Sequence, residues 1–91
     1  MKSYSYLCNK NAMSKEEYIE YLVENNYISI ATNENLHQPE DMSNLQWFKL
    51  AMDVIRLVSN YYYDDEKQCI LDWDEWLDEI FFTIKKETGD I

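Results

Sequence analysis

The chain is poor in the residues that interrupt regular structure and in those that most often carry out reactions. Its 91 residues include one Gly, one Pro, one His and two Cys. So few chain breakers argue against a turn-rich β-sandwich and favour helices. Gly89 is the one glycine, which excludes a glycine-rich phosphate-binding loop, and the few Cys and His residues do not suit a zinc site.

Positive charge is also scarce. The chain has 8 Lys and Arg against 18 Asp and Glu, which gives a formal net charge of −10. Nucleic acid and anionic membranes are themselves negative, so we expect neither as a direct partner, whereas a basic protein groove is the natural complement. The self-repulsion favours a monomer or a weak dimer. The simpler interpretation is that the charge serves only solubility.

The sequence also lacks targeting signals. It does not begin with a charged and then apolar signal segment, and no apolar run is long enough to span a bilayer. We therefore expect a cytoplasmic protein with Cys8 and Cys69 as reduced thiols, Cys69 being buried beside Ile70 and Leu71.

Three helix starts carry the same chemistry, in which an N-cap is followed three residues later by Glu or Gln and is flanked by an apolar staple. The expected N-caps are Ser14, Ser43 and Asp72, and their capping-box partners are Glu17, Gln46 and Glu75 in the same order. The expected staples are the pairs Met13 and Tyr18, Met42 and Trp47, and Leu71 and Trp76.

The first helix is expected from about Lys15 to Asn25, ending in a left-handed turn at Asn25 and Asn26. The stretch YISIAT (27–32) then forms a short strand or a buried connection, residues 32–41 form a loop, and SYSYLC (3–8) alternates like a strand. The inner face of this helix is Tyr18, Ile19, Leu22 and Val23.

Two more helices follow, at about 44–60 and 73–86, each with an apolar stripe at helical spacing. The stripe of the second helix is Trp47, Phe48, Ala51, Val54, Ile55 and Val58, widened by Leu50, Met52 and Leu57; that of the third is Trp73, Trp76, Leu77, Ile80 and Ile84. We predict one small, acidic, mainly α domain over residues 1–91. It is a bundle of three to four helices, with room for one short strand or hairpin from the N-terminal half.

Candidate catalytic groups are few. His37 lies in the polar loop, and its spacing from Cys8 and Cys69 does not indicate a nucleophile–base pair. Asp72 and Asp74 look like the start of a calcium loop, but its sixth and twelfth positions, a Gly and a Glu, are here Leu77 and Thr83. We therefore expect no catalytic residue, no metal, no cofactor and no enzymatic activity.

The segment from Asn60 to Ile80 concentrates acids beside aromatics. Lys67 is its only base. The acids at 74 and 78, and those at 75 and 79, are i,i+4 pairs of like charge, which a helix built only for stability would avoid. Residues 72–79 carry five charges over about 10 Å, close to the roughly six of duplex DNA in that length. The predicted partner-binding residues are Tyr62, Tyr63, Asp64, Asp65, Glu66, Asp74, Glu75, Asp78 and Glu79.

The order of elements from Phe48 to Lys86 is an amphipathic helix, an aromatic and acidic break at 61–66, and an acid-opened helix at 72–80. This order resembles small acidic bacteriocin immunity proteins, especially the colicin D type. The resemblance implies a helical bundle that binds a nuclease toxin and covers its active cleft with acidic side chains.

Three functions remain open from the sequence. The first is an immunity-type inhibitor that blocks the nucleic-acid site of a basic nuclease in a bacterium. The second is a phage inhibitor of the anti-CRISPR type, acting in the host cell on the nucleic-acid channel of a CRISPR-type effector. The third is a helical adaptor or regulatory subunit that binds through Tyr and Trp, its charge serving only solubility.

Overall fold

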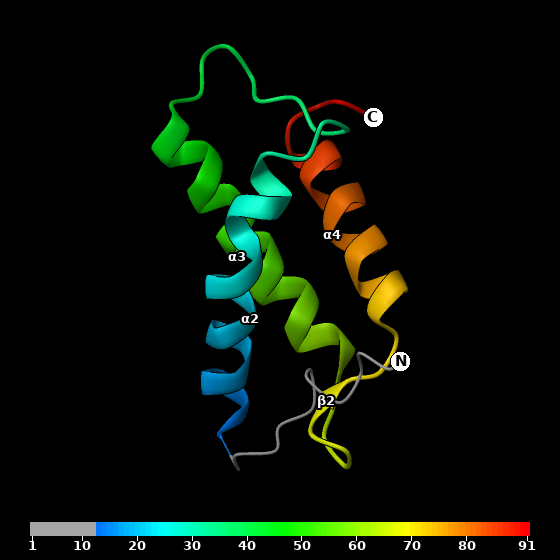
Figure 1. The fold of residues 1–91 in the computed structure, drawn as a ribbon. Coiled ribbons are helices and arrows are strands. Elements are labelled where there is room, and N and C mark those ends of the chain that lie inside the picture. The colour runs from blue at the N-terminus through cyan, green and yellow to red at the C-terminus, as the bar shows by residue number, and fades with distance from the viewer. Residues whose placement is uncertain (1–12) are drawn as a thin grey trace.

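The computed structural model describes residues 13–91, which form three helices and a two-stranded hairpin (Figure 1). The elements are α2 (Lys15–Ala31), α3 (Asn44–Tyr62), β1 (Tyr63–Asp64), β2 (Cys69–Ile70) and α4 (Trp73–Glu87). α3 is the central helix because it contacts both α2 and α4. The predicted mainly α bundle is therefore confirmed. The strand-like stretch at residues 3–8, whose structure the sequence left open, and Cys8 with it lie outside the described residues.

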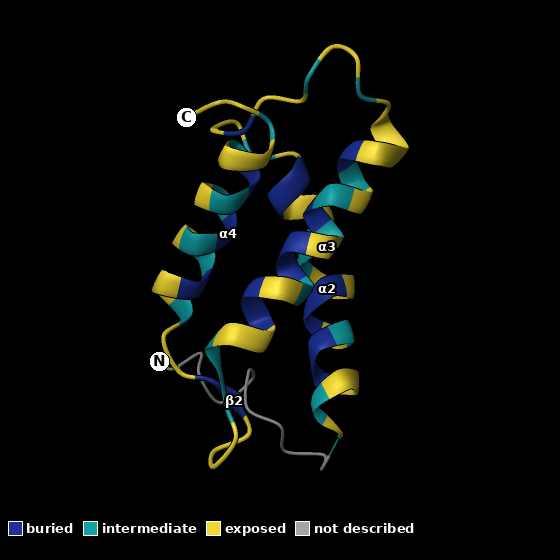
Figure 2. Cartoon of the chain, turned by 180° about the vertical axis from the view of Figure 1, so that it is seen from behind, coloured by how far each residue is buried: buried dark blue, intermediate teal, exposed yellow. Residues whose placement is uncertain are grey.

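The core runs between the three helices, whose buried faces point toward one another (Figure 2). All four residues predicted for the inner face of the first helix are buried, and Ile55, Trp76 and Ile80 are 0% exposed. The apolar stripe predicted for α3 was too wide, however, because Leu57 is 63% exposed. Packing on two sides covers the centre of this stripe but not its edge.

The two serine caps form as predicted. The hydroxyl of Ser14 accepts a hydrogen bond from the Glu17 amide at 3.1 Å, and the Glu17 carboxylate accepts one from the Ser14 amide at 3.0 Å. Ser43 and Gln46 repeat the arrangement at 3.2 and 2.9 Å. These reciprocal bonds satisfy amides that the first turn of a helix leaves without partners.

The predicted capping box at Asp72 is wrong. Asp72 precedes α4 but its side chain makes no capping hydrogen bond. Its ψ is 73°, whereas the two serine caps have ψ values of 164° and 163°. Only the extended backbone turns a cap side chain toward the amides of the first turn. Leu71, the expected staple residue beside Asp72, is exposed, so the predicted burial of Cys69 holds against Ile70 and not against Leu71.

The first helix does not end at Asn25, so residues 27–31 of the predicted strand or connection are helical instead, and Thr32 is the C-cap. Asn25 and Asn26 donate side-chain hydrogen bonds at 2.7 Å to the carbonyls of Tyr21 and Leu22, one turn earlier. Their side-chain amides therefore bond to the helix backbone, and neither residue adopts the left-handed conformation that would end the helix. Burial of Ile30 in the core then extends α2 by about one and a half further turns.

The hairpin of the described residues 13–91 is formed by residues 63–70, in the C-terminal half. Tyr63 pairs with Ile70 and Asp64 with Cys69 in antiparallel register. Gln68 closes the turn with a φ of 57°. The buried Tyr18 hydroxyl accepts a hydrogen bond from the Ile70 amide at 3.3 Å, which fastens the hairpin to α2.

Two buried tryptophans fix how the helices meet. The Trp76 indole donates a hydrogen bond to the Ser59 hydroxyl at 2.9 Å, joining α4 to α3. The Trp47 indole donates to the Ala31 carbonyl at 2.6 Å, joining α3 to the end of α2. Because a buried N–H without a partner is costly, each bond favours one relative position of two helices.

An ion pair joins α2 to α3 at the surface. The Arg56 guanidinium donates hydrogen bonds to both carboxylate oxygens of Glu20 and, at 3.0 Å, to Asp53. The hydrogen bond from Arg56 lowers the pKa of Glu20, and that bond likewise raises the pKa of Arg56. The cation of Arg56 is therefore already engaged by two acids and is directed toward α2.

Replacing Ile80 by Ala tests the core. Ile80 is 0% exposed, so the substitution removes packed methyl groups and leaves a cavity, at a cost of about 2–5 kcal/mol of unfolding free energy. Urea denaturation followed by circular dichroism measures it. Leu45→Ala is the control, because Leu45 is 75% exposed and its loss should change stability by less than about 0.5 kcal/mol. Equal effects of the two substitutions would contradict this packing.

Candidate protein-binding surface

The acids of α4 lie on two sides of the helix. Asp74 and Asp78 are exposed, and each is two residues from the buried Trp76. Two residues correspond to a rotation of about 200°, so these carboxylates point away from the core. Glu75 and the half-buried Glu79 are one turn apart on the edge nearest α3. The four acids are therefore held by one rigid helix but do not form a single row.

Tyr62, at the end of α3, lies beside the edge formed by Glu75 and Glu79. Partial burial of its ring raises the pKa of the Tyr62 hydroxyl, and the carboxylates of Glu79 and Glu75 raise it further because they oppose a phenolate. Asp72 contributes in the same direction. Tyr62 thus belongs to the same negatively charged area as the acids on that edge.

The predicted hairpin residues divide into structural and exposed groups. Asp64 stabilises the turn, since its carboxylate accepts hydrogen bonds at 2.9 Å from the amides of Glu66 and Lys67. Asp65 and Glu66 are exposed in that turn, together with Lys67. The charges of Asp65 and Glu66 are therefore available to a partner, whereas that of Asp64 is partly used by the hairpin.

Tyr63 packs toward α2 and not toward α4. Its ring meets that of Tyr18 edge to face at 5.4 Å, and the ammonium of Lys15 lies 5.5 Å from its centre. These contacts give Tyr63 a role in holding the hairpin. The structure therefore separates Tyr63 from Tyr62, although the sequence grouped them.

Six acids remain as an exposed or half-exposed group, which we call the acidic surface. It consists of Asp65, Glu66, Asp74, Glu75, Asp78 and Glu79. Ion pairs within residues 13–91 involve Glu20, Asp53 and Asp90 and none of these six. None of the six acids is therefore compensated by an ion pair within that part of the chain.

Two exposed residues of α3 were not predicted as binding residues. Tyr61 is 88% exposed and Leu57 is 63% exposed, one helical turn apart. The sequence offered a signal, since three consecutive tyrosines at the end of a helix cannot all face the core. It did not distinguish which of them is the most exposed.

No group of three or more His, Cys, Asp and Glu side chains is placed to hold a metal ion within residues 13–91. His37 is exposed in the loop and lies 3.5 Å from the Asp90 carboxylate. In the same range, none of the helices combines the length and the apolar character needed to cross a membrane.

Comparisons with protein-family models, with curated proteins and with solved structures find no match to this chain.

The pKa of Tyr62 provides a test of this geometry. Glu79→Gln should bring the pKa of Tyr62 closer to the ordinary tyrosine value of about 10, because it removes a nearby negative charge. Titration of the tyrosine ring carbons by NMR measures it, with Glu24→Gln as a control on the exposed face of α2. Equal pKa values in both variants would contradict the predicted proximity.

The same shift predicts how stability changes with pH. The folded chain keeps the Tyr62 proton at pH values where the unfolded chain has lost it. This contribution to the unfolding free energy is therefore complete below about pH 10 and is lost as the pH rises through the folded pKa. The decrease should be smaller in Glu79→Gln than in Glu24→Gln, as measured by urea denaturation over that pH range.

Proposed function

We propose that this chain binds a basic protein and blocks that protein's nucleic-acid site with the acidic surface. The observation that carries the proposal is the arrangement of α4. Four carboxylates project from one rigid helix, and within residues 13–91 none of them forms an ion pair. A surface shaped only by stability would relieve such repulsion with i,i+4 cations.

Charge complementarity explains how such a surface acts. A groove that binds nucleic acid is lined with Lys and Arg, which bind phosphates and release counterions. Carboxylates fixed on a helix offer negative charge at a similar linear density, without the conformational cost of ordering a flexible chain. Long-range attraction between the two surfaces also accelerates their encounter.

Two biological settings fit this mechanism. In one, the chain is an immunity-type protein that protects a bacterium from a basic nuclease toxin. In the other, it is a phage protein that occupies the nucleic-acid channel of a CRISPR-type effector in the host cytoplasm. Both require the same displacement of nucleic acid by carboxylates and differ in the identity of the partner.

A helical adaptor is the second candidate function. The exposure of Leu57 and Tyr61 favours it, because these side chains offer apolar contact area outside the acidic surface. An adaptor that depends on apolar contact binds with little dependence on salt, whereas an inhibitor that imitates nucleic acid weakens as ionic strength rises.

Charge reversal tests the proposal. Asp74→Lys, Asp78→Lys and Glu79→Lys together should leave the fold intact, because Asp74 and Asp78 are exposed and Glu79 is half-exposed. The triple variant and the unchanged chain are each used to capture partners from a lysate of the native host. The unchanged chain should retain a basic nuclease or nucleic-acid-binding protein that added duplex DNA or high salt releases. The triple variant should bind this protein at least about tenfold more weakly.

The matched control reverses three acids elsewhere. Glu24→Lys, Glu34→Lys and Glu40→Lys change the net charge equally at exposed positions on α2 and in the loop that follows it. This control should keep its partner with nearly unchanged affinity. An equal loss of affinity in both variants would show that net charge, and not the position of the acids, determines binding. A partner that stays bound in high salt and with competing DNA would favour the adaptor.

A further inference from the structure

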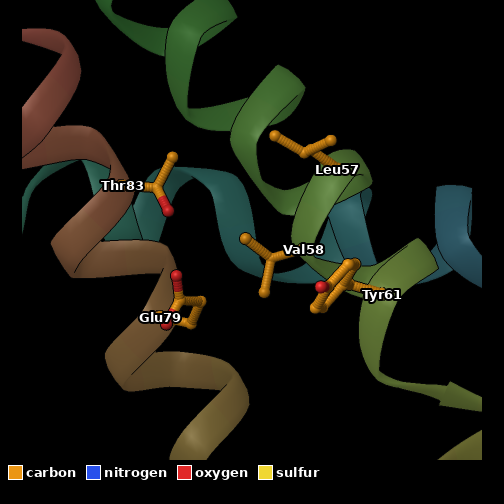
Figure 3. Close-up of a pocket in the computed structure, with 5 residues that line it drawn as sticks. All are labelled: Leu57, Val58, Tyr61, Glu79 and Thr83. Atoms are coloured by element: carbon orange, nitrogen blue, oxygen red, sulfur yellow. The ribbon is translucent and has the colours of Figure 1, made fainter.

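A groove runs along the surface between α3 and α4. It consists of two hollows, of about 290 and 280 Å³, that share Leu57 and Thr83 and so form one depression. Leu50, Leu57 and Tyr61 line it from α3, while Glu79, Thr83 and Glu87 line it from α4. Figure 3 shows Glu79 and Thr83 pointing toward the α3 side chains.

The groove is open because α4 presents small or charged side chains along this edge. Glu79, Thr83 and Glu87 follow one another at intervals of four residues, so they form one row on the helix. None of them is a large apolar residue that could cover Leu57, which stays 63% exposed. The apolar edge of α3 is therefore left without a covering side chain from α4.

The rims of the groove are negative. Glu79 and Glu87 border it from α4, and neither forms an ion pair within residues 13–91. Asp53 borders it from α3, but its carboxylate is bound by Arg56 at 3.0 Å. An apolar floor with two unpaired acids on one rim matches a ligand that is apolar on one face and basic beside it.

We propose that this groove binds an amphipathic helix of a protein partner, with apolar residues against Leu57 and Tyr61 and Lys or Arg beside Glu79 and Glu87. Residues 50–61 of α3 extend for about 16 Å, which is three turns of helix. The occupant therefore presents apolar residues at i, i+4 and i+7 or i+8, with its basic residues on the side nearer α4.

A second copy of this chain is a poorer occupant. Each copy carries a net charge of −10, so the negative rims of one would face the negative surface of another. This inference depends on the proposed function in one respect, namely that the partner is positively charged. The groove supplies apolar affinity, which charge alone does not, and this makes the two contributions separable by experiment.

The probe is a fluorescein-labelled peptide of about 14 residues, Leu and Lys only, with its leucines along one helical face. Fluorescence anisotropy in about 0.15 M salt measures its binding. A scrambled peptide of the same composition should bind the unchanged chain about tenfold more weakly, because it has no continuous apolar face. NMR spectra with the amphipathic peptide should change at residues 50–61 and 79–87 and not along α2.

Two variants and one control locate the site. Leu57→Ser removes the exposed apolar contact and should weaken binding of the amphipathic peptide about tenfold, whereas Leu45→Ser, on the same helix, should leave it within about twofold. Thr83→Leu fills the groove and should weaken binding similarly while retaining the helical content. Thr83→Leu therefore still tests the groove if the Leu57→Ser variant does not fold.

Several results would overturn the inference. They are equal binding of both peptides, unchanged binding by both groove variants, or a dimer in sedimentation that Leu57→Ser dissociates. The proposed function fails separately, when reversal of Asp74 and Asp78, which do not line the groove, leaves the native partner bound. A native partner that is lost on that reversal but retained by Leu57→Ser and Thr83→Leu would support the acidic surface and contradict the groove.

Discussion

The buried hydrogen bond between Trp76 and Ser59 is the constraint on which the arrangement of α3 and α4 depends. Both residues are 0% exposed, so neither the indole N–H nor the hydroxyl has water as an alternative partner. The bond fixes the rotation of α4 about its axis, and that rotation sets where every charge on the helix points. Asp74 and Asp78 face outward, and Glu79 borders α3, because Trp76 faces Ser59.

Much of the fold could be predicted from local sequence, and the exceptions have physical causes. The serine caps and the inner face of the first helix follow from chemistry within one or two turns. The end of α2 does not, because burial of Ile30 and Ala31 against other elements outweighs the turn preference of two asparagines. The hairpin likewise depends on Tyr18, a residue far away in the chain.

The candidate site was predictable in composition but not in arrangement. The excess of acids at 64–79 is visible in the sequence, and α4 holds four of them as an amphipathic helix requires. The separate roles of Asp64, which closes a turn, and of Tyr63, which packs on Tyr18, required the tertiary structure. The exposure of Leu57 was missed because periodicity assigns a residue to a stripe without showing whether a neighbour covers it.

The contact between Tyr18 and Ile70 also bears on the order in which α2 and the hairpin form during folding. The Ile70 amide belongs to a strand of two residues, but it donates its hydrogen bond to a side chain 52 positions earlier. Closing so long a loop is slow compared with forming a local turn, so we expect this hydrogen bond to form only once α2 has docked. We therefore expect hydrogen exchange at Ile70 to depend on the opening of α2, although the two segments are distant in sequence.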